Sequence, residues 1–184
     1  MNWTWIIIIA VIVVVAMWLV RTYNALVQLR NAVKDQWSQI DVHLKRRADL
    51  VPNVVETVKG YAGHEKETLE AVINARNKAV SAGTKEEEIQ ANGELSGALS
   101  RLFALTEAYP DLKANTNFMD LQATLKDTED KIAFARQFYN DTVLKYKNKL
   151  EMFPTNLVAS IFGFKPELFF EATTAEKEVP KVQF

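Results

Sequence analysis

The chain has no cysteine and only two histidines, His43 and His64, among its 184 residues. Without cysteine the protein can form neither disulfides nor thiolate zinc sites, and it has no cysteine nucleophile. The spacing of the two histidines fits no metal-binding pair on one helix face. The sequence therefore predicts no metal site of these types.

Net charge is also close to absent, at -1, although 24% of residues are charged and 48% are hydrophobic. This balance predicts that most of the chain folds, and it supplies no overall attraction to nucleic acid or acidic lipid. We expect no nucleic-acid partner.

Catalytic motifs are missing as well. The sequence contains no G-x-S-x-G, no Gly-rich phosphate loop, no H-E-x-x-H and no Asp-rich calcium loop. His64, followed by Glu65, lies at an expected helix junction, where a cap or surface role is commoner than catalysis. We predict a non-enzymatic protein without catalytic residues, cofactor or metal.

The first twenty residues carry no charged side chain. From Trp3 to Val20 the segment is apolar except for Thr4. Its length of 18 residues is at the short end of what crosses a membrane. Trp3, Trp5 and Trp18 lie near its ends, where indoles favour the membrane interface. A cleaved signal peptide is the alternative, but a basic first region and a small-residue cleavage site are missing. We predict a retained anchor over residues 1–20.

Flanking cations predict the orientation of this anchor. No Lys or Arg precedes it, whereas Arg21, Arg30 and Lys34 follow it. The positive-inside rule then places the N-terminus outside and the rest of the chain in the cytoplasm.

The rest of the chain has helical periodicity. After the anchor, apolar residues recur in steps of three, four and seven: Leu26, Leu29, Val33, Trp37, Ile40, Leu44, Val51, Val54, Val58 and Tyr61. No Gly or Pro separates Val20 from Leu26, so one helix should run from about residue 3 to about residue 62.

Three further helices are expected, over about 64–82, from Thr84 to the region before Pro110, and over about 116–152. Gly83 is expected in the left-handed conformation, and Thr84 with Glu87 should form a capping box. The run Glu86–Glu88 suits a helix start better than a metal site. The stretch "YPDLKAN" is expected as a loop, and Asp127 should pair with Lys131.

These expectations define an all-α protein, in which a transmembrane helix continues into an antiparallel bundle of about four helices. The predicted domains are residues 1–20 (anchor), 21–155 (bundle) and 156–184 (tail). The tail is apolar and aromatic at first, with Phe162, Phe164, Phe169 and Phe170, and polar towards its end. It either packs on its own bundle or contacts lipid or another subunit.

Several long stretches give the sequence a resemblance to the LemA family of bacterial membrane proteins. They are residues 23–65, residues 109–122 ("YPDLKANTNFMDLQ"), residues 136–164 and the "FFEA" turn at residues 169–172. The resemblance implies one N-terminal membrane helix and a long-helix domain, but no reaction and no catalytic residue. The family it points to includes proteins implicated in magnetosome membrane formation. Some members resemble lipoproteins, which implies the opposite location, periplasmic or extracellular, as the alternative.

The segment "KRRADLVPN" places Arg47 where the seven-residue apolar spacing expects a core residue. A cation there is costly unless it is paired, and its partner should come from another helix or another chain. Pro52 frees the carbonyl of Ala48 and should bend the helix. We interpret the segment as a register and bend element; an anionic-ligand or partner contact is the alternative.

Arg136 and Asn140 are spaced to share one helix face. They form either a polar recognition site or a hydrogen-bonded pair that sets helix register.

The favoured function is a scaffold that anchors in lipid through residues 3–20, self-associates as a homo-oligomer and organises a membrane or envelope complex. The alternative is an accessory binding module for a membrane protease or a signalling partner. The tail phenylalanines are the candidate oligomer contact.

Overall fold

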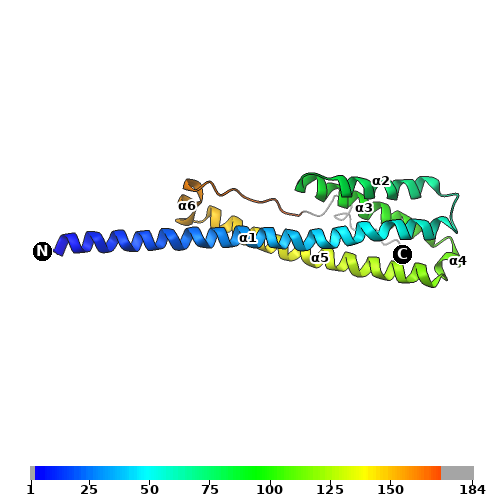
Figure 1. Cartoon of the computed structure of the whole chain (residues 1–184), viewed down its shortest axis with the longest axis horizontal. Helices are drawn as coiled ribbons and strands as arrows, with labels where there is room; N and C mark the ends of the chain where they lie inside the picture. Colours follow the sequence, from blue (N-terminus) through cyan, green and yellow to red (C-terminus); the bar gives the residue numbers. More distant parts are fainter. Residues whose placement is uncertain (1–2, 171–184) are drawn as a thin grey trace, which may run out of the picture. The chain divides into compact units, whose positions relative to one another are not determined.

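The computed structural model describes residues 3–170, and within that range it contains six helices and no strand (Figure 1). The helices are α1 (Trp3–Lys59), α2 (Lys66–Ser81), α3 (Lys85–Thr106), α4 (Pro110–Lys113), α5 (Thr116–Glu151) and α6 (Thr155–Ile161). The predicted all-α class is confirmed.

The first helix, α1, runs for 57 residues without a break, from the apolar segment into the bundle. Nothing in its sequence stops it until Gly60, and Pro52 lies inside it. It ends slightly earlier than expected, at Lys59. Tyr61 therefore falls outside the helix and is exposed, unlike the buried Val54 and Val58 before it.

The turn between α2 and α3 contains the predicted capping box. The Thr84 hydroxyl accepts a hydrogen bond from the Glu87 amide at 3.2 Å, and the Glu87 carboxylate accepts from the amides of Thr84 and Gly83. The left-handed conformation expected at Gly83 is wrong, since Gly163 is the one described glycine with a positive φ. Ala82 leaves α2 with an extended ψ of 131° instead, so no left-handed residue is needed.

The stretch "YPDLKAN" is not the plain loop that we expected. Pro110 begins the short helix α4, where its missing amide costs nothing because the first turn has no partner for it. Leu112 of α4 is fully buried. A buried apolar side chain thus accounts for a helical turn where we expected a loop.

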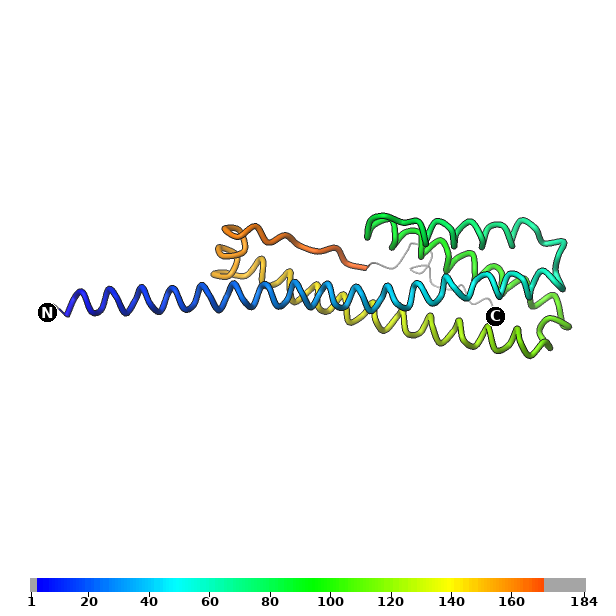
Figure 2. Tube along the Cα trace, viewed as in Figure 1, coloured from blue at the N-terminus to red at the C-terminus, as the bar shows by residue number. Residues whose placement is uncertain are grey.

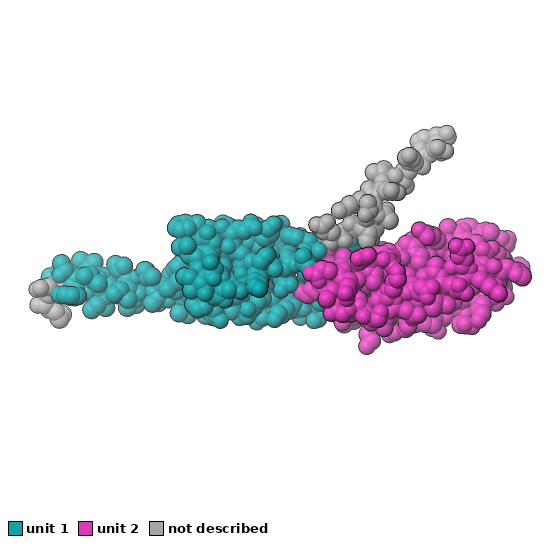
Figure 3. Space-filling model, turned by 90° about the horizontal axis from the view of Figure 1, so that it is seen from above, with its two compact units in different colours: residues 1–39, 136–169 teal, residues 40–135, 170–184 magenta. Residues whose placement is uncertain are grey.

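Packing groups the chain into two compact units (Figure 3). Unit 1 comprises residues 1–39 and 136–169, and unit 2 comprises residues 40–135 and 170–184. The helices α1 and α5 contribute to both. The three segments predicted from sequence follow the order of the chain rather than this packing, and they stay a prediction.

Unit 2 contains a continuous apolar core between α1, α2, α3, α4 and α5. Its buried side chains are Val51, Val54, Val55, Val58, Ala62, Leu69, Val72, Ala75, Leu95, Leu99, Leu102, Leu112, Phe118 and Leu125. Each fully buried leucine or valine contributes about 1.5–3 kcal/mol relative to an exposed one. Burial of these side chains stabilises the packing of the helices in unit 2.

In unit 1 the part of α1 from Thr22 to Gln39 and the last part of α5 run side by side in opposite directions (Figure 2). The rings of Trp37 and Tyr139 meet edge to face, with centroids 5.2 Å apart. The buried side chains include Leu26, Val33, Tyr139, Val143, Tyr146, Val158 and Ala159. The segment from α6 onward folds back along this pair, as the hydrogen bond from the Tyr139 hydroxyl to the Leu168 carbonyl (2.7 Å) shows.

Candidate functional site

Arg47 lies at the centre of a polar network in unit 2, with only 1% of its surface exposed. Its Nη1 donates to Ser96 Oγ and to Glu129 Oε1, both at 2.7 Å. Its Nη2 donates to the side-chain oxygen of Asn92 at 2.7 Å and to the Asn92 carbonyl at 3.1 Å. The expected partner of this cation thus comes from other helices of the same chain, α3 and α5.

A second polar contact involves the next residue of α1, Ala48. Pro52 has no amide hydrogen, so the carbonyl of Ala48 lacks its usual donor within the helix. Arg76 of α2 supplies one: its Nε donates to the Ala48 oxygen at 3.2 Å. The sequence indicated the free carbonyl but not the residue that satisfies it. The bend expected near Pro52 stays a prediction.

A polar cavity of about 340 Å³ lies between α1, α2 and α3 in unit 2. Its lining combines acidic, basic and small residues: Asp41, Leu44, Lys45, Ala48, Asp49, Arg76, Ala79, Val80, Ala82, Glu88 and Asn92. One wall therefore continues into the Arg47 network through Asn92. Within residues 3–170, no group of three or more His, Asp or Glu side chains is arranged to hold a metal ion.

Two carboxylates meet in this cavity. Burial raises the pKa of Glu88, and the neighbouring Asp41 carboxylate raises this pKa further by charge repulsion and by a hydrogen bond between the two side chains. The nearby Lys85 ammonium acts in the opposite direction. We missed this pair in the sequence, because Glu88 had been explained by the helix start and Asp41 is distant from it in the chain.

An open groove of about 800 Å³ runs between α3 and α5 in unit 2. Its lining combines five apolar residues, Leu99, Phe103, Met119, Ala123 and Leu125, with five polar ones, Ser96, Ser100, Gln122, Lys126 and Glu129. The sequence pattern did not separate this face of α5 from the core. A groove of this size is suited to a side-chain cluster or a helix of a partner protein.

The tail phenylalanines are used in different ways. The rings of Phe162 and Phe164 lie 4.9 and 5.7 Å from the ring of Tyr23, and the Arg30 guanidinium lies 5.2 Å from the Phe164 ring. The Lys147 ammonium lies 5.9 Å from the Phe169 ring. Phe170 is buried and Phe162 is 57% exposed. Their predicted role as an oligomer contact stays a prediction.

The structure gives the positions of the other predicted site residues, and their roles stay predictions. Arg136 and Asn140 lie one turn apart on α5 and are half-buried. The exposed pair Asp127–Lys131 forms as expected, at 2.8 Å. Tyr146 is buried, which raises the pKa of its phenol; the nearby Arg30 lowers this pKa and Glu167 raises it.

The predicted anchor is the exposed first part of α1. Its most apolar 18-residue window has a mean hydropathy of 2.7, and none of that window is buried. Trp3, Trp5 and Trp18 are exposed along it, and the exposed Arg21 follows it directly. By length and composition this is the one described helix able to cross a membrane.

These features define a class: helical-bundle proteins with one N-terminal helix that is long and apolar enough to span a membrane. A sequence model of the LemA family matches residues 36–184. The chain belongs to the LemA family, as its resemblance had predicted.

Individual relatives agree with this membership. The chain is 26% identical to Magnetosome protein MamQ 2 of Paramagnetospirillum magneticum, over 91% of its own length and 71% of that protein. It is 25% identical to Magnetosome protein MamQ of Magnetospirillum gryphiswaldense, over 85% and 67% of the two chains. It is also 25% identical to Protein LemA of Metamycoplasma hominis, over 84% and 71%. None of these names is that of an enzyme.

Proposed function

We propose that this protein is a non-enzymatic scaffold, anchored in the membrane by residues 3–20, that self-associates and organises a membrane or an envelope complex. The domain is assigned to the cytoplasmic side of a bacterial inner membrane, with the outer side as the alternative. Lipid around the anchor and further copies of the chain are its proposed partners.

The continuity of α1 is the observation that carries this proposal. One helix leads from the apolar segment into both packed units, without a linker. A flexible linker would let a domain move independently of its anchor, whereas a continuous helix couples the anchor directly to the helices packed on α1 within unit 1. Such rigid coupling suits a protein that holds a defined geometry at a membrane.

The names of the relatives support a role at a membrane. Two of them are named as magnetosome proteins, and both match most of this chain. These names support a non-enzymatic, membrane-associated role for this chain, and its organising role remains our proposal.

Mass measurement of the full-length protein in several mild detergents tests self-association. We expect a mass of two or more chains, after subtraction of detergent, that persists on dilution. A strictly monomeric protein in all of these detergents would contradict the proposed self-association.

The groove between α3 and α5 favours a second candidate, an accessory module that binds a membrane protease or a signalling protein. Met119 lies in this groove and is half-exposed. If this candidate holds, Met119→Asp should abolish co-purification of a defined partner, whereas Leu144→Asp, outside the groove and similarly exposed, should not. Equal retention by both variants would contradict groove binding.

A further inference from the structure

An exposed apolar patch lies where α5 ends and α6 follows, within unit 1. We call it the α6 patch; its members are Met152, Phe153, Leu157, Ile161 and Phe162, with Phe153 79% and Ile161 74% exposed. The opposite side of α6, with Val158 and Ala159, is buried. Short helices with one buried and one exposed apolar side need an apolar environment on both sides.

The position of the α6 patch along α1 is given by ring contacts. Phe162 packs against Tyr23 at 4.9 Å between centroids. Burial supports the same position: α1 is exposed throughout residues 3–21, and Thr22 is its first buried residue. The bundle therefore begins to cover α1 immediately after the apolar segment.

Helix geometry converts this position into a depth. Tyr23 lies three residues beyond Val20, about 4.5 Å along the helix axis. The headgroup layer on each side of a hydrocarbon core is about 5–7 Å thick. If residues 3–20 cross the core, Tyr23 lies within the headgroup layer, and the ring that packs on it lies at the same depth.

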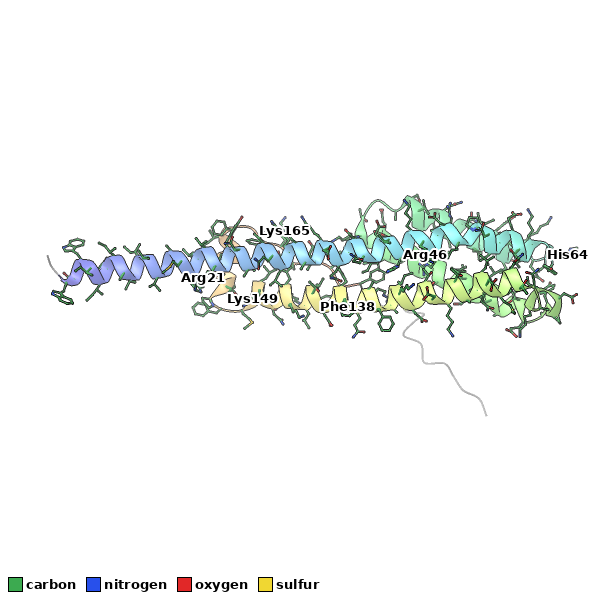
Figure 4. All side chains as sticks on the ribbon, turned by 60° about the horizontal axis from the view of Figure 1, so that its bottom comes forward. Arg21, Arg46, His64, Phe138, Lys149 and Lys165 are labelled. Carbon is green, nitrogen blue, oxygen red and sulfur yellow. The ribbon has the colours of Figure 1, made fainter. Side chains whose placement is uncertain are left out.

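Charges around the patch complement lipid headgroups. Arg21 and Lys149 are exposed, and Figure 4 shows them near each other where α5 ends; the exposed Lys165 lies further from the apolar segment, and Phe138, earlier in α5, lies further still. The one acidic side chain at this end of α5, Glu151, is 3.9 Å from Lys147. Apolar rings surrounded by cations are the pattern of an interfacial membrane contact.

We propose that the α6 patch inserts into the headgroup–acyl boundary of the same membrane that α1 spans, as a second attachment. This goes beyond the scaffold role but rests on the proposed anchoring of α1. Lipid is favoured over a second copy of the chain as the occupant, because the patch is continuous with the apolar segment and lies at headgroup depth. Two attachments would fix the tilt and rotation of the bundle about its anchor.

The absence of cysteine makes a direct test simple. Single variants Phe153→Cys and Ile161→Cys of the full-length protein are labelled with an environment-sensitive fluorophore. They are reconstituted into vesicles of phosphatidylethanolamine and phosphatidylglycerol that contain nitroxide lipids. We expect strong quenching by nitroxides in the headgroup or high on the acyl chain, and weak quenching by nitroxides near the bilayer centre.

Two matched controls use side chains of similar exposure. Phe138 is 62% exposed and lies about 20 Å before the end of α5 at Glu151, so a label at Phe138→Cys should not be quenched by any lipid. Ile12 is 61% exposed within the apolar segment, so a label at Ile12→Cys should be quenched best by nitroxides near the bilayer centre.

The outcomes separate the two proposals. If Ile12 is quenched but Phe153 and Ile161 are not, the α6 proposal fails while the anchor stands. If the two patch labels escape lipid quenching and are also shielded from aqueous iodide, a second copy covers the patch, and the lipid assignment is overturned. If Ile12 is not quenched either, the anchor and the α6 attachment both fail.

Discussion

At the residue scale, Arg47 is held by acceptors on two different helices. Ser96 and Asn92 are neutral, so Glu129 alone supplies a negative charge to this network. A buried guanidinium contributes little to net stability, but it strongly penalises any register in which its acceptors are missing. The network therefore selects one alignment of α1, α3 and α5 within unit 2.

Glu129→Gln tests the contribution of this charge. The amide keeps the size of the side chain and one acceptor, but leaves the cation uncompensated. We expect the free energy of unfolding to fall by about 1.5–3 kcal/mol, measured by urea titration of helical circular dichroism in detergent. The control is Glu94→Gln, which breaks the exposed pair with Lys78 (2.9 Å) and should cost below about 1 kcal/mol. Equal losses would contradict a special role for Arg47.

Glu88 predicts a pH dependence. Its pKa is raised above 4.5 in the folded protein, so the folded state binds more protons than the unfolded state from about pH 4.5 up to the raised pKa. Stability from this group is therefore lost as the pH rises through that window. Glu88→Gln should raise the free energy of unfolding at neutral pH, with a gain that vanishes below pH 4.5.

Glu86→Gln is the matched control for this pH profile. It removes an exposed carboxylate from the same helical turn without touching the cavity. It should leave the shape of the profile unchanged. A profile of Glu88→Gln that runs parallel to that of the unmodified protein would rule out the effect of the Asp41–Glu88 pair.

At the scale of elements, Pro52 couples α1 to α2. The proline leaves the Ala48 carbonyl without a helix donor, and Arg76 donates to it from α2. A side chain of one helix thus completes the backbone hydrogen bonding of another. This arrangement explains how α1 tolerates an internal proline without ending.

A double-mutant cycle tests the coupling. Arg76→Met should cost about 1 kcal/mol or more, because it leaves a buried carbonyl unsatisfied. In the Pro52→Ala background the amide of residue 52 can serve that carbonyl, so the same change should cost less by about 0.5–1 kcal/mol. Lys78→Met, which removes a cation from the exposed side of α2, should cost the same in both backgrounds. Identical costs for Arg76→Met would show that no coupling exists.

At the scale of the whole molecule, three flanking cations predict on which side of the membrane the domain lies. Arg21, Arg30 and Lys34 follow the apolar segment and no Lys or Arg precedes it. A reporter that works only in the cytoplasm should be active when it is fused after Phe184, whereas a reporter that works only outside should be inactive there. Three lysines inserted before Trp3 should move a measurable fraction of the reporter to the other side. Activity only outside, in the unmodified protein, would overturn the assignment.

The sequence by itself determined the features that depend on near neighbours. The apolar period predicted α1, and the Thr84–Glu87 spacing predicted the capping box, because both involve residues within a few positions of each other. It was less reliable where tertiary burial competes with local preference. Leu112 is buried by a helical turn that we expected to be a loop, and Gly83 was assigned a conformation that the chain does not use.

Only the tertiary structure decided which helix faces meet. The partners of Arg47 lie 45, 49 and 82 positions away, and Arg76 is 28 positions from the carbonyl that it serves. Periodicity shows that a face is apolar but not what covers it, because many alignments bury the same area. Packing selects among them through a few unpaired groups, such as one cation and one free carbonyl, that can be satisfied in a single register.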